Sequence, residues 1–144
     1  MKKLSNEFME KILNDSAWKE LSENFEWTEQ MLDKHKNQVD WKLISQNSNI
    51  VWTPAMLEKF KDYWDWSELS ENTSLEINYQ LIDKFIDQWD WSELINRWDN
   101  NNIYNIDFLE RYADKIPSSK LQDSRLWTIL VEQREKELKL EVIA

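Results

Sequence analysis

The chain has 144 residues, a formal net charge of −10, and neither cysteine nor glycine. Without glycine it has no phosphate-cradling loop, dinucleotide-binding turn or nucleophile elbow, because each needs backbone that approaches a ligand or adopts positive φ. The negative charge argues against nucleic acid as a ligand, since phosphate binding needs a cationic surface. No apolar signal core or membrane span is visible, so we expect a soluble cytoplasmic protein of one domain, residues 1–144.

Tryptophan recurs at nearly constant spacing, at Trp18, Trp41, Trp66 and Trp91, and Ser118 occupies the same position once more. The spacings between these five anchor positions are 23, 25, 25 and 27 residues. A period of this size, sustained along the chain, is typical of a repeat array whose units bury their apolar faces against neighbours. The sequence therefore predicts about five repeats over residues 5–123.

A helix-start signal is found in every repeat. Ser, Thr or Asn side chains at such a position accept hydrogen bonds from the free amides of a first helical turn. Apolar residues directly before this cap and at the fourth helical position form a hydrophobic staple. Pro54 follows one of the caps at the first helical position, which suits proline. The predicted capping residues are Ser5, Thr28, Thr53, Asn78 and Asn105.

Each capped helix carries an acidic residue followed by a basic one, and then a large, mostly aromatic residue. We interpret the charges as ladders on a solvated face between stacked helices, in preference to a paired-carboxylate site. His35, the only histidine, falls in the aromatic slot, which indicates a half-buried ring in the core rather than a catalytic base. The acid–base pairs are Glu10 and Lys11, Asp33 and Lys34, Glu58 and Lys59, Asp83 and Lys84, Glu110 and Arg111.

A second, shorter helix is predicted to begin at each anchor position. Trp66 and Leu69 bracket polar residues at a helical spacing, whereas a strand would alternate. Asn24, Asn47 and Asn72 follow, and asparagine tolerates the left-handed backbone of a helix C-cap where no glycine is available. We therefore expect each repeat to comprise a short helix, an asparagine turn and a longer capped helix.

Residues 124–144 leave this pattern and predict a longer amphipathic helix that caps the array. The predicted fold is all-α, a short α-solenoid of stacked helix pairs with this C-terminal capping helix. The alternative is a leucine-rich-repeat-like α/β solenoid, with a strand in each unit and the asparagines in a ladder. Two features favour the helical fold: the Trp-to-Leu spacing, and Leu75, which comes one position too late after Asn72 for that motif.

At Trp18–Asn24 and Asp65–Asn72 the chain resembles the tandem tryptophan-containing repeats, about 25 residues long, of uncharacterised proteins from large DNA viruses and some bacteria. The resemblance covers residues 5 to about 121 and implies a helical repeat architecture, with no established activity. The fourth repeat departs from the pattern, because Ile95 and Arg97 replace the serine and the asparagine. An inserted segment also lengthens it, with Trp98, Asp99, Asn100, Asn101 and Asn102.

Two surface features are candidates for contact with a partner. The tryptophans at repeat positions are expected in the core, whereas Trp98 has no repeat counterpart and is the expected exposed anchor, together with residues 99–102. These residues lack the spacing of a calcium loop, so no metal site is predicted. The second feature is an acidic stripe, which stacking of the repeats would align along one edge. Its residues are Glu20, Glu68, Glu71 and Glu93.

These features predict a non-enzymatic module that binds a protein partner with a basic surface, without a cofactor, a metal or direct contact to nucleic acid. A sharper hypothesis is a virus-encoded inhibitor or nucleic-acid mimic that occupies a basic groove. The alternative from another class is a structural, self-associating scaffold, and the oligomeric state stays open. A hydrolase using carboxylates such as Asp87 and Asp90 is disfavoured, because acid pairs are expected by chance at this composition.

Overall fold

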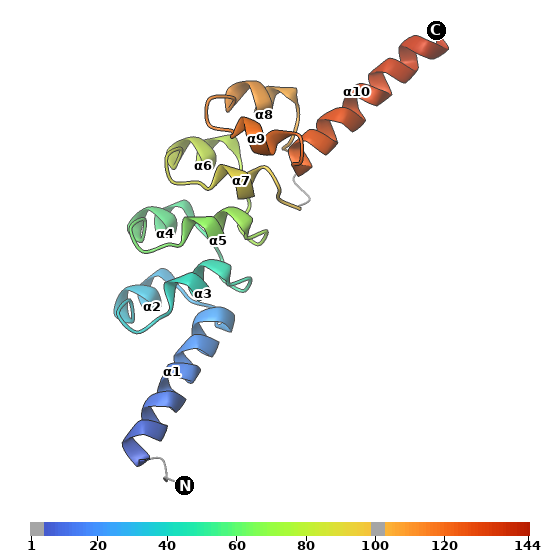
Figure 1. Cartoon of the computed structure of the whole chain (residues 1–144). Coiled ribbons are helices and arrows are strands. Elements are labelled where there is room, and N and C mark those ends of the chain that lie inside the picture. The colour runs from blue at the N-terminus through green and yellow to red at the C-terminus, as the bar shows by residue number, and fades with distance from the viewer. Residues whose placement is uncertain (1–4, 99–102) are drawn as a thin grey trace. The chain divides into compact units, whose positions relative to one another are not determined.

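The computed structural model of the chain describes residues 5–98 and 103–144. Within these residues all regular secondary structure is helical and no strand is present (Figure 1). The prediction of an all-α fold is confirmed, and the leucine-rich-repeat-like α/β alternative is wrong. The segments after the anchor tryptophans close helical hydrogen bonds, for example from Leu69 N to the Asp65 carbonyl at 3.0 Å. The chain divides into two compact units, Met1–Leu75 and Glu76–Ala144, which are described separately.

The first unit consists of a long helix followed by two pairs of short ones. Helix α3 packs against α1 and also against α5, so the helices that begin at successive anchors are stacked (Figure 1). The bounds of the helices are α1 Asn6–Asn24, α2 Glu29–Lys34, α3 Trp41–Gln46, α4 Pro54–Lys59 and α5 Trp66–Glu71.

In its described residues, the second unit contains four short helices and a long terminal one. Its short helices α7 and α9 begin at the anchor positions Trp91 and Ser118, as the spacing predicts. The predicted C-terminal helix is present as α10, and its cap Ser124 accepts a hydrogen bond from Trp127 N at 3.1 Å. The bounds are α6 Tyr79–Lys84, α7 Trp91–Leu94, α8 Ile106–Arg111, α9 Ser118–Leu121 and α10 Arg125–Ile143.

The five predicted helix caps are confirmed. Each side chain accepts a hydrogen bond from the amide three residues later, for example Thr53 from Met56 N at 3.1 Å.

The expectation that these capped helices are the longer of each pair is wrong in the first unit, where α2, α3, α4 and α5 each span 6 residues. The His35 carbonyl accepts from the amides of both Gln38 and Val39, so the backbone tightens into a turn that ends α2.

The first repeat is a single helix rather than the predicted pair. In the next three repeats a buried apolar residue anchors the turn, and the aspartate after it caps the second helix, as Trp64 and Asp65 do. Ser16 and Ala17 occupy these two positions in the first repeat. Ser16 has no apolar side chain to bury at the anchor position, and Ala17 has no side-chain acceptor at the cap position, so α1 runs through both predicted helices without a break.

The asparagine of each turn is not a left-handed cap, contrary to the prediction. Asn47 and Asn72 have φ of −63° and −74° and lie in extended backbone. Their buried side chains instead reach the preceding turn. Asn72 Nδ2 donates to the carbonyls of Ser45 and Asn47 at 2.9 and 3.0 Å. Asn47 Nδ2 donates to the carbonyls of Ser22 and Phe25 at 3.0 and 2.9 Å. An asparagine ladder is thus formed between helices.

Buried serines complete this ladder. Ser45 Oγ donates to the Trp41 carbonyl at 2.7 Å and accepts from Asp65 N at 3.0 Å, which fixes one anchor helix against the next. Asn24, the first asparagine of the column, ends α1 and donates to the Glu20 carbonyl of its own helix at 3.3 Å. The hydroxyl and amide groups therefore find partners within the chain, as buried polar groups must.

Charged residues form the predicted ladders between neighbouring helices. Lys59 of α4 lies 3.6 Å from Glu29 and 3.8 Å from Asp33 of α2. In the second unit Arg111 of α8 pairs with Asp83 of α6. All these side chains are substantially exposed, so solvent screens each pair and its contribution to stability is small.

Aromatic residues fill the interior of both units. Trp27, Trp64, Trp89 and Trp91 are buried. The His35 ring is half-buried, with its centroid 5.6 Å from that of Trp18 and 6.3 Å from that of Trp27, so its predicted role as a core residue is confirmed.

Candidate functional site

An acidic groove lies on the surface of the first unit. It has a volume of about 390 Å³ and is formed by the end of α3, the turn after it, α5 and the turn that follows α5. The groove brings together two residues of the predicted acidic stripe, Glu68 and Glu71. Gln46, Ser48, Asn72 and Thr73 line the rest of it, and sequence reasoning did not single them out as site residues.

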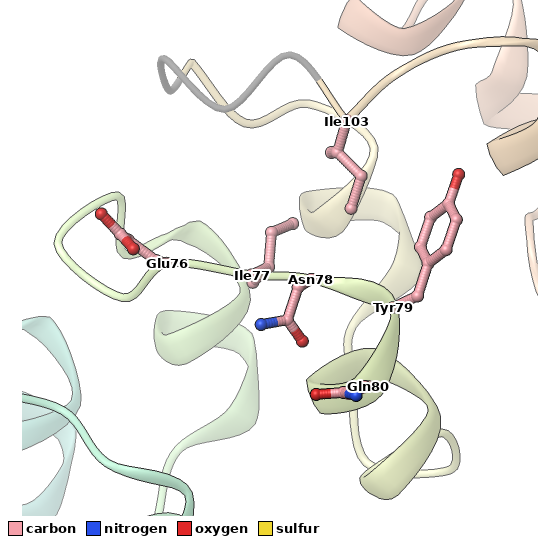
Figure 2. Close-up of a pocket in the computed structure, with 6 residues that line it drawn as sticks. All are labelled: Glu76, Ile77, Asn78, Tyr79, Gln80 and Ile103. Carbon is pink, nitrogen blue, oxygen red and sulfur yellow. The ribbon is translucent and has the colours of Figure 1, made fainter.

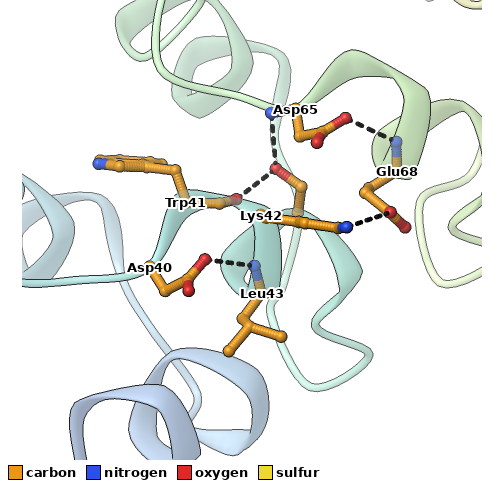
Figure 3. A network of polar contacts seen from close by, with 7 residues as sticks. Asp40, Trp41, Lys42, Leu43, Asp65 and Glu68 are labelled. Carbon is orange, nitrogen blue, oxygen red and sulfur yellow. Dashed lines mark hydrogen bonds and ion pairs between the residues drawn. The ribbon is translucent and has the colours of Figure 1, made fainter. Parts of the chain in front are cut away.

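Local hydrogen bonds fix the helix that presents the two carboxylates. Asp65 Oδ1 accepts from Glu68 N at 3.2 Å and thereby caps the start of α5 (Figure 3). Leu69 and Ser70 are fully buried on the other side of this helix. Because α5 is held at its start and along its inner face, Glu68 and Glu71 are directed outward.

The two carboxylates differ in their electrostatic surroundings. Lys42 Nζ of α3 lies 3.9 Å from Glu68 Oε1 and partly neutralises it (Figure 3). Within the described part of the chain, Glu71 forms no ion pair. On α3 the position equivalent to Glu68 is Leu43, so the acidic stripe is interrupted there. The groove therefore offers one free carboxylate beside one that is already paired.

The other residues of the predicted stripe lie outside this groove. Glu20 is exposed on α1, and its Oε2 accepts a hydrogen bond from Asn24 Nδ2 at 3.1 Å. Glu93 is half-buried on α7 of the second unit and does not line the groove.

Trp98 is the most exposed aromatic side chain among the large apolar residues in the described ranges, with 73% of its surface accessible. Its predicted exposure is confirmed, whereas its contact with a partner stays a prediction. The Arg125 guanidinium lies over the ring, with Cζ 3.9 Å from the centroid, a cation–π contact that sequence reasoning missed. Asp99, Asn100, Asn101 and Asn102 lie outside the described residues.

A second hollow, of about 530 Å³, is found in the second unit. Figure 2 shows Ile103 opposite the segment that leads into α6, with Ile77 and Tyr79 on the facing side. The polar residue at its centre, Asn78, is already engaged as a helix cap, because its Oδ1 accepts from Leu81 N at 2.8 Å.

One cluster of titratable groups lies between α6 and α8. Tyr112 donates its hydroxyl proton to Asp83 Oδ1 at 2.9 Å, and Arg111 donates to Asp83 Oδ2. The Arg111 guanidinium holds the pKa of Asp83 below its ordinary value. Burial, followed by the bond to Asp83, raises the pKa of Tyr112 to about 12. Both shifts move the groups away from neutral pH, opposite to the needs of a general acid or base.

The described residues contain neither a cluster suited to a metal ion nor a helix suited to a membrane. In residues 5–98 and 103–144, no group of three or more histidine or carboxylate side chains is arranged to hold a metal ion. No helix of the described ranges combines the length and apolar character needed to cross a membrane.

Comparison of the chain with protein-family models, curated proteins and solved structures finds no match.

Proposed function

We propose that the protein is a non-enzymatic α-solenoid module that binds a basic protein partner through the acidic groove between α3 and α5. In this proposal the repeats of residues 5–123 stack into one array and α10 caps it. The observation that carries the proposal is the placement of Glu68 and Glu71 in one groove, on a helix whose position is fixed by its cap and by the serine–asparagine ladder.

The chemistry of the groove suits lysine and arginine side chains. A carboxylate accepts charge-assisted hydrogen bonds, and a guanidinium group can bond to one in a bidentate manner. Gln46, Ser48 and Thr73 add neutral polar groups around the two carboxylates. The net charge of −10 would attract a basic partner at long range and raise the rate of encounter.

A sharper form of the proposal concerns the identity of the partner. Carboxylates held at intervals on a repeat array can stand in for phosphates, so the natural target would be a protein whose basic groove normally receives nucleic acid. The protein would then act as an inhibitor or nucleic-acid mimic. The protein itself would not bind nucleic acid.

The test measures binding of the full chain to a set of purified basic nucleic-acid-binding proteins by calorimetry at low and high salt. The double substitution of Glu68→Gln and Glu71→Gln is expected to weaken binding about tenfold or more at low salt. The matched control is the double substitution of Glu58→Gln and Glu110→Gln, which changes net charge equally on exposed helix positions and should bind nearly as well as the wild type. Equal losses in both variants would show that only net charge matters and would contradict the groove.

A self-associating scaffold is the second candidate function. It is favoured by large apolar side chains exposed near both ends of the chain, among them Phe8, Leu13, Leu138 and Val142. Light scattering separates the two candidates. Assemblies that keep growing with concentration favour the scaffold, whereas a species of fixed size favours the docking module.

A further inference from the structure

The first half of α1 exposes side chains that are core residues in a later repeat. The caps Ser5 and Thr53 align residues 5–12 with residues 53–60. In this alignment Ile12, which is 45% exposed, corresponds to Phe60, which is 2% exposed. Phe8 and Met9 are exposed in the same way, whereas their counterparts Met56 and Leu57 are buried. The first half of α1 thus carries the apolar face of a repeat helix but covers nothing with it.

Helix α2 has a matching uncovered face. Met31 is 39% exposed, although its counterpart Met56 on α4 is 3% exposed. Helix α4 already lies beside one face of α2, because Lys59 Nζ of α4 is 3.6 Å from Glu29 Oε1 of α2. The open face of α2 is therefore the opposite one, on which the helix of a preceding repeat would pack.

The two uncovered faces also match in charge. Within each unit the base of a capped helix pairs with the acid of the capped helix before it, since Lys59 pairs with Asp33 and Arg111 with Asp83. By the same rule Lys34 of α2 should pair with Glu10 of α1. Both side chains are exposed, and within the described residues neither forms an ion pair.

The chain's own first segment does not reach this face. A fold-back would need a turn before Trp18, and the turn positions hold Ser16 and Ala17 in place of a buried anchor and a capping aspartate. Figure 1 shows the result, since α1 continues as one helix away from the α2–α3 pair.

We propose that two copies of this chain form a closed dimer by exchanging these segments. Residues 6–16 of each copy lie on the open face of α2 in the other, which covers Ile12 and Met31 and pairs Glu10 with Lys34. The exchange is reciprocal, so it closes at two copies instead of growing into a filament. It does not involve Glu68 or Glu71, so a failure of the dimer and a failure of the acidic groove are distinguishable.

The test is sedimentation equilibrium of the full chain across a range of concentrations. The wild type is expected at twice the chain mass of 17.7 kDa. Substitution of Ile12→Glu should raise the dissociation constant of the dimer about tenfold or more. Leu138→Glu is the matched control, because it places the same charge on α10 at a residue that is 49% exposed, and it should leave the dimer intact.

Two further sets of variants test the details of the exchange. Glu10→Lys and Lys34→Glu should each weaken the dimer, and the two changes combined in one chain should restore it. Ser16→Trp with Ala17→Asp rebuilds the turn found at Trp64 and Asp65, so the segment should fold back on its own α2 and leave a monomer. Circular dichroism establishes that each variant remains helical.

Several outcomes would overturn the proposal. These are a wild type that is monomeric at every concentration, an assembly that grows beyond two copies, and a dimer disrupted by Leu138→Glu but not by Ile12→Glu. A dimer that survives restoration of the turn would also overturn it.

Discussion

The side-chain amide of Asn72 donates a hydrogen bond to the backbone carbonyl of Asn47 at 3.0 Å, which joins two turns that are 25 residues apart. Asn47 does the same to the carbonyls of Ser22 and Phe25 one repeat earlier. Water does not reach this buried column, so the partners of these polar groups must come from the chain. The column therefore sets one turn at a fixed position relative to the next.

Substitution of Asn47→Ala should lower the free energy of unfolding by about 2–4 kcal/mol, because two carbonyls lose a donor and Asn49 N loses an acceptor at 2.6 Å. Urea denaturation followed by circular dichroism measures the change. Asn37→Ala, in an exposed turn, is the matched control and should have little effect. If the two variants lose equal stability, the ladder does not contribute as described.

Stability should fall more steeply at alkaline pH in the wild type than in Tyr112→Phe. The pKa of Tyr112 is raised from 10.0 to about 12 in the folded protein, so the unfolded chain releases this proton first as the pH rises. The contribution of the neutral hydroxyl is fully present below pH 10.0 and is lost as the pH rises towards about 12. Urea denaturation at several pH values in this window measures it.

The matched control for this experiment is Tyr63→Phe, since Tyr63 is exposed and its hydroxyl forms no hydrogen bond within the described residues. This variant should keep the slope of the wild type. An identical slope in Tyr112→Phe would show that Tyr112 ionises normally in the folded protein.

Substitution of Trp98→Ala should weaken binding to the partner by about 2 kcal/mol if the side chain is an anchor. Its exposed contact with Arg125 contributes at most about 1 kcal/mol to stability, so the melting temperature should change little. Calorimetric binding and thermal melting measure the two effects. The control Trp91→Ala removes a buried ring and should cost about 3–5 kcal/mol of stability. Normal binding by a Trp98→Ala protein that melts much lower would contradict the anchor.

The helix starts could be predicted from the sequence because the interactions that make them lie within one helical turn. Thr53, for example, needs only the amide of Met56. The charge ladders were also predictable, since the acid and the base recur at the same two positions of each repeat and stacking places them on neighbouring helices.

The continuous first helix has a signal in the sequence. Ala17 stands where Asp40, Asp65 and Asp90 stand in later repeats. The aspartate caps the anchor helix in those repeats, so alanine at this position removes the cap that would start a second helix.

The sequence by itself determined the class of fold, the starts of the five capped helices and the exposure of Trp98, because these depend on local spacing and on the repeat. Tertiary structure alone decided the role of the buried asparagines, the pairing of Lys42 with Glu68 and the contact of Arg125 with Trp98. Each of these joins groups that are distant along the chain. Their energies depend on burial and approach distance, which one-dimensional spacing does not contain.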